Sequence, residues 1–234
     1  MPTDWCAPFG RVVTPLNKTV RTQELYDCRN KVLRPLFDCA YPWEMLSRIG
    51  EYIHFLLESG IEGYTLLAPD VLVGENVKIH ESAVILPPAV IGANSELRPG
   101  AFLRGNVIVG EGCVLGNSSE FKNCVLCDHV QAPHYNYVGD SVLGNYAHLG
   151  AGAVCSNLKA GGGDVTVHGE EDYPTGRRKV GAFLADHADI GCGCVLNPGT
   201  VVGKNTSAYP LTPLRGVYPE NCIIKSADNV VKKI

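Results

Sequence analysis

A six-residue hydrophobic repeat constrains this chain more than any other feature. Every sixth residue is apolar over one long stretch: Val73, Ile79, Ile85, Ile91, Leu97, Leu103, Val109, Leu115 and Phe121. A period of six fits neither an amphipathic helix nor an alternating strand. It predicts a short-repeat solenoid in which three hexads close one coil of a triangular β-helix. One coil cannot bury its apolar residues alone, so the coils must stack.

Glycine often follows the aliphatic residue of a hexad. The set is Gly74, Gly92, Gly110, Gly116, Gly144, Gly150, Gly191 and Gly203. We interpret this position as a corner that needs unusual backbone angles, which glycine adopts readily.

The repeat slips by one residue on each side of a polar segment, APHYNYVGD (132–140). The first slip falls before Leu126 and the second before Leu143, after which the phase holds to Cys155. Slips of this kind bulge a corner and redirect a side chain, and we interpret them as building a site.

The repeat is interrupted by an insertion at 158–181, which has three consecutive glycines and a basic patch ending at Lys179. We expect a surface loop or hairpin here that could carry function. The hexads resume at Leu184 and continue through Ile190 and Leu196 to Val202. We therefore predict a β-helix over 71–209 and a C-terminal tail over 210–234.

A helical arm is expected before the repeat, over 1–70. Residues 1–20 are proline-rich and are expected to be irregular. Helical spacing then predicts one helix from Thr22 to Leu33, ended by Pro35, and a second over 42–59, stopped by Gly60. We expect these helices to pack on the end of the solenoid and to cover an exposed sheet edge.

Composition limits the classes of function. The chain has 234 residues, a formal net charge of -4 and no long basic run, which argues against a nucleic-acid partner. It contains ten cysteines. Several occupy repeat positions, such as Cys113, Cys155 and Cys194, and are expected to be core residues in a reducing compartment. The Cys124–Cys127 pair is a weak zinc signal without a second pair. Without a signal peptide or apolar span, a cytoplasmic location and no membrane partner are predicted.

The best catalytic candidate among the residues themselves is His134, which follows the first slip. A neutral imidazole can take a proton from an attacking amine or hydroxyl near pH 7. Lys122 and Arg98 each follow an aliphatic position, and their charges suit either solvent or an anionic substrate group.

The chain resembles the acetyltransferase half of the bifunctional UDP-N-acetylglucosamine pyrophosphorylase/glucosamine-1-phosphate N-acetyltransferase. The likeness lies in RPGAFL (98–103), GNSSEFKN (116–123), APHYNYVGDSVLG (132–144) and HLGAGAVCSN (148–157). TGRRKVGA (175–182) adds a likeness to sugar-1-phosphate nucleotidylyltransferase-type proteins. The resemblance implies an all-β left-handed parallel β-helix, a homotrimer, and acetyl-CoA bound between subunits.

The resemblance also implies roles for individual residues at the reacting centre. His134 matches the general base, and Asn157 matches an asparagine near the reacting amine. Ala151 matches a backbone contact to acetyl-CoA. His148 stands where the acetyltransferase motif has an asparagine, so it could supply a second imidazole.

Four further residues match substrate contacts of the family. Arg98 and Lys122 match the basic residues that hold the sugar phosphate. Tyr137, in the motif H-x-x-Y-x-G-D, matches a contact to the same substrate. Lys179 matches a second phosphate-binding lysine. The implied reaction is acetyl transfer from acetyl-CoA to an amino-sugar phosphate resembling glucosamine 1-phosphate, within nucleotide-sugar biosynthesis and without a metal. The nucleotidyltransferase half of the family has no counterpart here, so we do not expect this chain to make a nucleotide sugar by itself.

Alternatives from other classes remain open. A metal-dependent hydratase like the γ-class carbonic anhydrases would use His129 and His134, which have the spacing of that class, but position 93 is Ala93 and the nearest upstream histidine is His80. A catalytically silent trimeric scaffold is a third possibility. An O-acetyltransferase acting on another sugar is also open.

Overall fold

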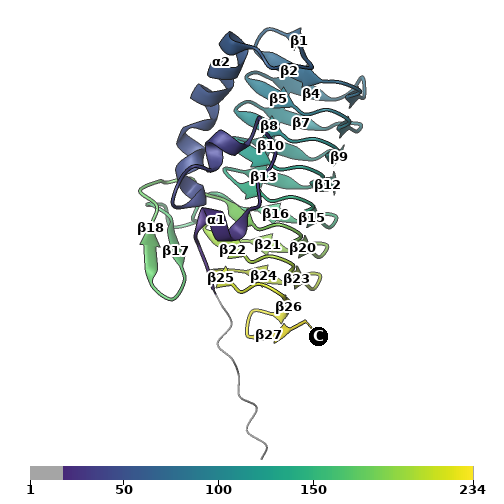
Figure 1. Ribbon diagram of the computed structural model, residues 1–234. Helices are drawn as coiled ribbons and strands as arrows, with labels where there is room; N and C mark the ends of the chain where they lie inside the picture. Colours follow the sequence, from purple (N-terminus) through teal and green to yellow (C-terminus); the bar gives the residue numbers. More distant parts are fainter. Residues whose placement is uncertain (1–17, 234) are drawn as a thin grey trace, which may run out of the picture.

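The computed structural model describes residues 18–233, and the repeat forms a stack of parallel coils (Figure 1). Each coil contributes one short strand to each of three sheets, which we call A, B and C. Sheet A comprises β1 (Tyr64–Ala68), β2 (Val71–Gly74), β5 (Ala89–Ile91), β8 (Val107–Val109), β11 (Cys124–Leu126), β14 (Val142–Leu143), β19 (Ala182–Leu184), β22 (Thr200–Val202) and β25 (Val217–Tyr218).

The other two long sheets complete the coils. Sheet B comprises β3 (Lys78–Ile79), β6 (Glu96–Leu97), β9 (Val114–Asn117), β12 (Gln131–His134), β15 (His148–Leu149), β20 (Asp189–Ile190), β23 (Ser207–Ala208), β26 (Cys222–Ser226) and β27 (Asn229–Lys232). Sheet C comprises β4 (Val84–Leu86), β7 (Phe102–Arg104), β10 (Glu120–Lys122), β13 (Tyr137–Gly139), β16 (Val154–Cys155), β21 (Val195–Leu196) and β24 (Pro213–Leu214).

Strand pairing confirms three hexads per coil. Val73 pairs with Ile91, eighteen residues later, in a parallel ladder. After the slip the coil shortens, and Leu126 pairs with Leu143, seventeen residues later. The parallel β-solenoid is therefore as predicted, while the left-handed turn stays a prediction.

The predicted aliphatic residues fill the interior of the solenoid, most of them fully buried. Cys113, Cys155 and Cys194 lie in the same interior, as predicted. Burial raises the pKa of the Cys113 and Cys155 thiols to about 12, so these side chains are uncharged core residues at neutral pH. Cys124 also packs inside, whereas Cys127 packs under the arm, which separates the two thiols of the C-x-x-C pair.

The glycines after the aliphatic positions are explained by close packing, not by backbone angle as predicted. None of the eight has a positive φ. A Cβ on Gly92 would lie 2.4 Å from the carbonyl of Gly110, and one on Gly116 would lie 1.6 Å from the Pro133 carbonyl oxygen. The neighbouring coil therefore leaves no room for a side chain at these positions. The positive φ lies two residues after the glycine. Asn94, two residues after Gly92, is an example.

The arm contains α1 (Thr22–Leu25), η1 (Arg34–Phe37), η2 (Pro42–Ser47) and α2 (Ile49–Ser59). The first predicted helix was too long, because Tyr26 is extended and the Asp27 amide donates to Asp186 of the solenoid at 2.7 Å. Pro35 lies at the start of η1 and does not end a helix. The second predicted helix is confirmed as η2 followed by α2, with Gly60 at its C-terminus. The proline-rich segment is outside the described residues as far as residue 17.

The arm covers the outer surface of sheet A, which corrects the expectation that it caps an end of the solenoid. Leu72, Val90, Ile108, Val125, Val142, Phe183, Val201 and Val217 point outward from sheet A and are buried with the arm's apolar residues. Trp43 of the arm packs on Phe183, with ring centroids 5.9 Å apart. Figure 1 shows the helices running alongside the stack. Sheet A is apolar on both faces, so its outer face needs a cover, which the arm provides.

The ends of the stack are closed by strands. β1 pairs antiparallel with β2 at one end, and β27 pairs antiparallel with β26 at the other. Parallel pairing continues past residue 209 through β24, β25 and β26, so the solenoid extends into the segment predicted as a tail. The insertion forms a hairpin of β17 (Thr166–His168) and β18 (Asp172–Pro174). Within residues 18–233, no helix has the length and apolar character to span a bilayer.

Candidate functional site

Three predicted site residues meet around one buried carboxylate, that of Asp140, which is only 2% exposed. Lys122 Nζ lies 3.3 Å from Asp140 Oδ2. Asn157 Nδ2 donates to the same oxygen at 2.5 Å, and Asn123 Nδ2 donates to Oδ1 at 2.8 Å. We call these residues, with Tyr137, the Asp140 cluster. A buried carboxylate with three donors fixes the side chains that surround it.

The phase slips create this cluster. Phe121 and Leu126 are five residues apart instead of six, as are Val138 and Leu143, so the corner after sheet C is short. Asn123 and Asp140 occupy this corner with left-handed φ of 48° and 46°. Both are residue types that tolerate this conformation. The interpretation that the slips redirect side chains is consistent with this geometry.

Tyr137 reaches the cluster across Gly139. A Cβ on Gly139 would lie 2.6 Å from the Tyr137 hydroxyl and 2.7 Å from Asn157 Nδ2, so glycine makes room for both. Burial raises the pKa of Tyr137, and the carboxylates of Glu120 and Asp140 raise it further. The hydroxyl is therefore protonated at neutral pH and can donate a hydrogen bond.

The end of the insertion is fastened to the cluster. The Val180 amide donates to the Asn157 carbonyl at 3.0 Å, and the Gly181 amide donates to the Asp140 carbonyl at 2.7 Å. Lys179 pairs with Leu158 in an isolated bridge, and its side chain is exposed. Lys179, the predicted second phosphate-binding lysine, therefore lies beside Asn157 of the same chain.

His134 lies elsewhere, at the corner between sheets B and C. Its side chain is exposed, and its amide donates to Asn136 Oδ1 at 3.1 Å. Asn136 is buried and donates from Nδ2 to the Gly150 carbonyl at 2.8 Å. Tyr135, between them, has a φ of 51°. The buried amide thus fixes the backbone of His134 and leaves the imidazole free to face solvent.

Ala151 lies directly beside His134 in the next coil. The Gly152 amide donates to the His134 carbonyl at 3.0 Å, and the Ala151 carbonyl accepts from Gly193 at 2.8 Å. Ala151 is exposed, and a Cβ on Gly152 would meet nothing within 4 Å. Among residues 18–233, no partner is found for the Ala151 amide. We call His134, Ala151 and Gly152 the His134 corner; it is open and offers a free N–H.

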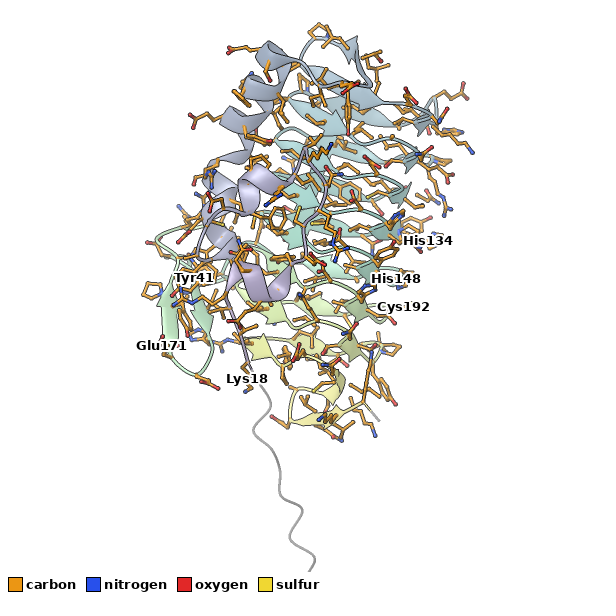
Figure 2. The ribbon with its side chains drawn as sticks, viewed as in Figure 1. Lys18, Tyr41, His134, His148, Glu171 and Cys192 are labelled. Atoms are coloured by element: carbon orange, nitrogen blue, oxygen red, sulfur yellow. The ribbon has the colours of Figure 1, made fainter. Side chains whose placement is uncertain are left out.

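His148 lies in the same coil as Ala151 and on the same sheet as His134. Its Nδ1 is 2.8 Å from Asp189 Oδ1, the residue opposite it in β20. Figure 2 shows His134, His148 and Cys192 along one edge of the stack. The predicted second imidazole is thus one coil from the first.

Arg98 also belongs to this side of the molecule. It follows β6, two strands from β12 in sheet B, and its Nε is 3.3 Å from Glu96 Oε1. The guanidinium group is partly exposed and has donors left for a ligand.

The predicted residues therefore form two groups on different sheets. Arg98, His134, His148 and Ala151 belong to sheet B and its corner. Lys122 ends β10, Asn157 follows β16 and Lys179 ends the insertion, whereas Tyr137 begins β13 and reaches this second group with its hydroxyl. Between His134 and Asp140 lie a corner and the length of β13, about 10 Å of strand. Within residues 18–233, no side-chain hydrogen bond or ion pair joins the two groups.

Sequence reasoning missed Asp140, Asn136 and Asp189 as site-building residues. Asp140 and Asn136 were visible inside the quoted segment APHYNYVGD, as polar residues at buried positions. Asp189 carried no such signal, because the insertion separates it from His148 by 41 residues of sequence.

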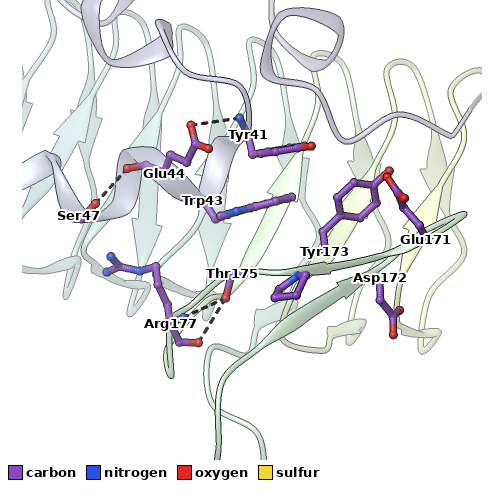
Figure 3. A pocket seen from close by; sticks show the side chains of 10 residues that line it. Tyr41, Trp43, Glu44, Ser47, Glu171, Asp172, Tyr173, Thr175 and Arg177 are labelled. Carbon is purple, nitrogen blue, oxygen red and sulfur yellow. Dashed lines mark hydrogen bonds between the residues drawn. The ribbon is translucent and has the colours of Figure 1, made fainter.

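A pocket on the arm side of the molecule lies away from both groups. One pocket of about 580 Å³ lies between η2 and the hairpin, with Tyr41, Trp43, Tyr173 and Arg177 among its lining residues (Figure 3). None of the predicted site residues lines it.

The histidines considered for a metal hydratase, His80, His129 and His134, have different surroundings. His129 precedes β12 and stacks on Tyr146, with ring centroids 4.6 Å apart, whereas His134 ends β12. His80 Nδ1 is 2.9 Å from Ser82 Oγ. Within the described part of the chain, no group of three or more His, Cys, Asp or Glu residues could hold a metal ion.

Comparisons with known proteins agree with the resemblance. The family model described as the GMPPB C-terminal domain matches residues 85–171. The bifunctional protein GlmU of Methanococcus vannielii is 28% identical over 201 residues, covering 84% of this chain and 48% of that protein. The bifunctional sugar-1-phosphate nucleotidylyltransferase/acetyltransferase of Sulfurisphaera tokodaii is 32% identical over 151 residues, covering 64% of this chain and 38% of that protein.

Among solved structures, the UDP-N-acetylglucosamine acyltransferase of Francisella novicida is 14% identical, covers 70% of this chain and 68% of that one, and has a TM-score of 0.41. A likeness this remote adds nothing to the argument on function.

The repeats and the sequence matches make this chain similar to hexapeptide-repeat acetyltransferase domains. In particular, it resembles the C-terminal half of the bifunctional protein GlmU. The chain spans about half the length, or less, of these relatives.

Proposed function

We propose that this chain is an acetyl-CoA-dependent acetyltransferase that acts on an amino-sugar phosphate resembling glucosamine 1-phosphate, within nucleotide-sugar biosynthesis. The observation that carries the proposal is the Asp140 cluster. The side chains of Lys122, Tyr137 and Asn157, all matched to substrate contacts or the reacting centre by resemblance, converge on one buried carboxylate. Such preorganisation is what a substrate-orienting site requires.

In the proposed reaction, His134 takes a proton from the amine as nitrogen attacks the thioester carbonyl. The C–N bond forms, the C–S bond breaks, and the electron pair leaves with the sulfur of coenzyme A. The free amide of Ala151 stabilises the negative charge that develops on the carbonyl oxygen. His134 is exposed and lies directly beside Ala151, which favours both roles.

Lys122 is the proposed phosphate contact of the Asp140 cluster. Its side chain is 28% exposed, and the ammonium group has three donors, so donors remain for a substrate oxygen. Lys179 adds a second positive charge beside Asn157, and Tyr137 donates from its hydroxyl. Arg98 supplies the corresponding charge on sheet B.

The proposed active site lies between subunits of a homotrimer. A corner and β13 separate the phosphate contacts at Asp140 from His134 within one chain, about 10 Å of strand or more. A sugar phosphate held by Lys122 would therefore meet the His134 of a neighbouring copy. Symmetric oligomers build such sites from two different surfaces of the same chain. We propose no metal and no nucleic acid in the reaction.

The test is a panel of amino-sugar 1-phosphates with acetyl-CoA, with thiol release as the readout and the acetylated product identified by mass spectrometry. We expect release with at least one amino-sugar phosphate and none with the sugar that lacks the amine. Binding of acetyl-CoA without turnover on any acceptor would favour the silent scaffold. Carbon dioxide hydration that depends on added zinc would favour the hydratase.

A further inference from the structure

Asn136 stands at a place in its coil that small side chains occupy in the two neighbouring coils. β13 pairs with β10 and with β16, and this register places Ser119 and Ala153 beside Asn136. Only 3% of Asn136 is exposed. Its amide is therefore enclosed between coils and must find its hydrogen-bond partners there.

Both polar atoms of the Asn136 side chain are hydrogen-bonded. Oδ1 accepts from the His134 amide at 3.1 Å and from the Ser119 hydroxyl at 3.4 Å. Nδ2 donates to the Gly150 carbonyl at 2.8 Å and to the Ala153 carbonyl at 3.3 Å. One side chain therefore joins the backbone of the proposed base to the turn of the next coil.

The Gly150 carbonyl shares a trans peptide group with the Ala151 amide. The C=O and N–H of a trans peptide point in opposite directions. Asn136 Nδ2 and the Ala153 amide, at 3.1 Å, both donate to the Gly150 oxygen, which directs the Ala151 N–H away from these two donors. A hydrogen bond to the carbonyl also polarises the peptide and strengthens its N–H as a donor. The buried side chain thus orients the exposed N–H of Ala151.

A second corner has the same kind of buried bond but no free N–H. Ser95 Oγ donates to the Gly110 carbonyl at 3.0 Å and accepts from the Cys113 amide at 3.0 Å. On the other side of that peptide, the Glu111 amide donates to Asp128 Oδ1 at 2.8 Å. The buried bond by itself is therefore a structural feature of the coil. At Asn136 it supports an N–H that the chain leaves unused.

The next coil lacks this support at the same edge. Ala153 there takes the place of Asn136, and the Gly191–Cys192 peptide corresponds to the peptide before Ala151. Over the part of the chain that the structure describes, no side chain donates to the Gly191 carbonyl. The asparagine therefore stands in the one of these two coils that carries His134.

We infer that Asn136 is a positioning residue of the proposed acetyl transfer. Through one amide it fixes the backbone of His134 and orients the Ala151 N–H, so the base and the oxyanion donor keep one relative position. A donor stabilises the charge on the thioester oxygen best when it is oriented before the reaction begins. This inference rests on the proposed function and deepens it, because it adds a residue that touches neither substrate.

The experiment compares Asn136→Ala with the wild-type chain, on an amino-sugar phosphate that the wild type acetylates. Loss of an oxyanion donor costs about a hundredfold or more in kcat; here the donor remains but loses its support, so we expect kcat to fall at least about tenfold. Coenzyme A has no acyl carbonyl, so its Kd, measured by calorimetric titration, should not change. Ser95→Ala is the matched control, since it removes the same kind of buried bond, and its kcat should equal that of the wild type.

Asn136→Asp is a second variant, of nearly the same shape. Its side chain still accepts from the His134 amide but can donate to the Gly150 carbonyl only when it is protonated. Full burial raises the pKa of a carboxyl by about 3 units or more, so the proton should be gained as the pH falls from about 8 to about 6. We expect the ratio of this variant's kcat to the wild-type kcat to rise over that range.

A kcat of Asn136→Ala no lower than that of Ser95→Ala would overturn the inference. So would a coenzyme A affinity that falls by the same factor as kcat, because the whole corner would then have been lost. If Asn136→Ala does not fold, the Asn136→Asp ratio decides, and a ratio independent of pH would overturn the inference. In each case the wild type still releases thiol, and the proposed function stands. A wild type without turnover on any amino-sugar phosphate would overturn the proposed function and this inference together.

Discussion

The Asp140 cluster and the His134 corner are built in opposite ways by the same repeat. The Asp140 carboxylate is 2% exposed and bonded to three side chains, so its surroundings are fixed before any ligand arrives. At the His134 corner only the backbone is fixed, through Asn136, while the imidazole and the Ala151 amide face outward. This difference supports the proposal that the Asp140 cluster binds substrate and that a second surface completes the His134 corner.

The largest expected effect tests how much the Asp140 cluster contributes to the free energy of unfolding. Asp140→Ala removes the acceptor of two amide groups and leaves Lys122 without its buried partner, so we expect a loss of about 3 to 5 kcal/mol in the free energy of unfolding. Urea unfolding measures it. The exposed Asp38→Ala serves as control, with no significant change expected; an equally small change for Asp140→Ala would mean that the cluster contributes nothing to stability.

The next effect tests the His134 corner and should leave stability unchanged. His134→Ala removes the proposed base, so turnover should fall at least about a hundredfold, equivalent to about 2.7 kcal/mol, while acetyl-CoA still binds. Thiol-release kinetics and calorimetric titration of acetyl-CoA measure the two quantities. His54→Ala, on the exposed side of α2, is the matched control. Unchanged turnover in the His134 variant would reject the role of base.

A smaller effect tests the phosphate contact that is proposed for Lys122 in the Asp140 cluster. Lys122→Ala should raise KM for the phosphorylated acceptor about tenfold, because a charge-assisted hydrogen bond is worth about 1.5 kcal/mol or more. The same variant should leave KM for the acceptor without phosphate unchanged. Steady-state kinetics with both acceptors measure the difference, and an equal loss with both would contradict the phosphate assignment.

The smallest expected effect concerns the contribution of a surface ion pair to stability. Arg104→Gln breaks an ion pair with Glu120 on the same sheet as Lys122, but Arg104 is exposed and Glu120 is partly exposed. Exposed ion pairs contribute little to stability, so the urea midpoint should not change measurably. A clear loss would show that the outer surface of sheet C is more rigid than its exposure indicates.

Much of this architecture could be predicted from local pattern. The hexad positions, the three hexads per coil, the second helix of the arm and the buried cysteines follow from periodicity and composition, and the structure confirms them. The errors arose where a residue's partner is distant in sequence. The helix from Thr22 ends early because Asp27 bonds to Asp186, and the glycines are required by the neighbouring coil instead of by their own φ.

By itself, the sequence determined the solenoid, because each six-residue unit has one residue that must be buried and no way to bury it alone. It also pointed to the segment around His134, since the phase slips are visible in the spacing. Only the tertiary structure decided that the arm covers sheet A, that Lys122 and Asn157 share the carboxylate of Asp140, and that His148 faces Asp189. The physical reason is that stacking joins residues about one coil apart, and across the insertion 41 residues apart, so these contacts depend on register and not on local spacing.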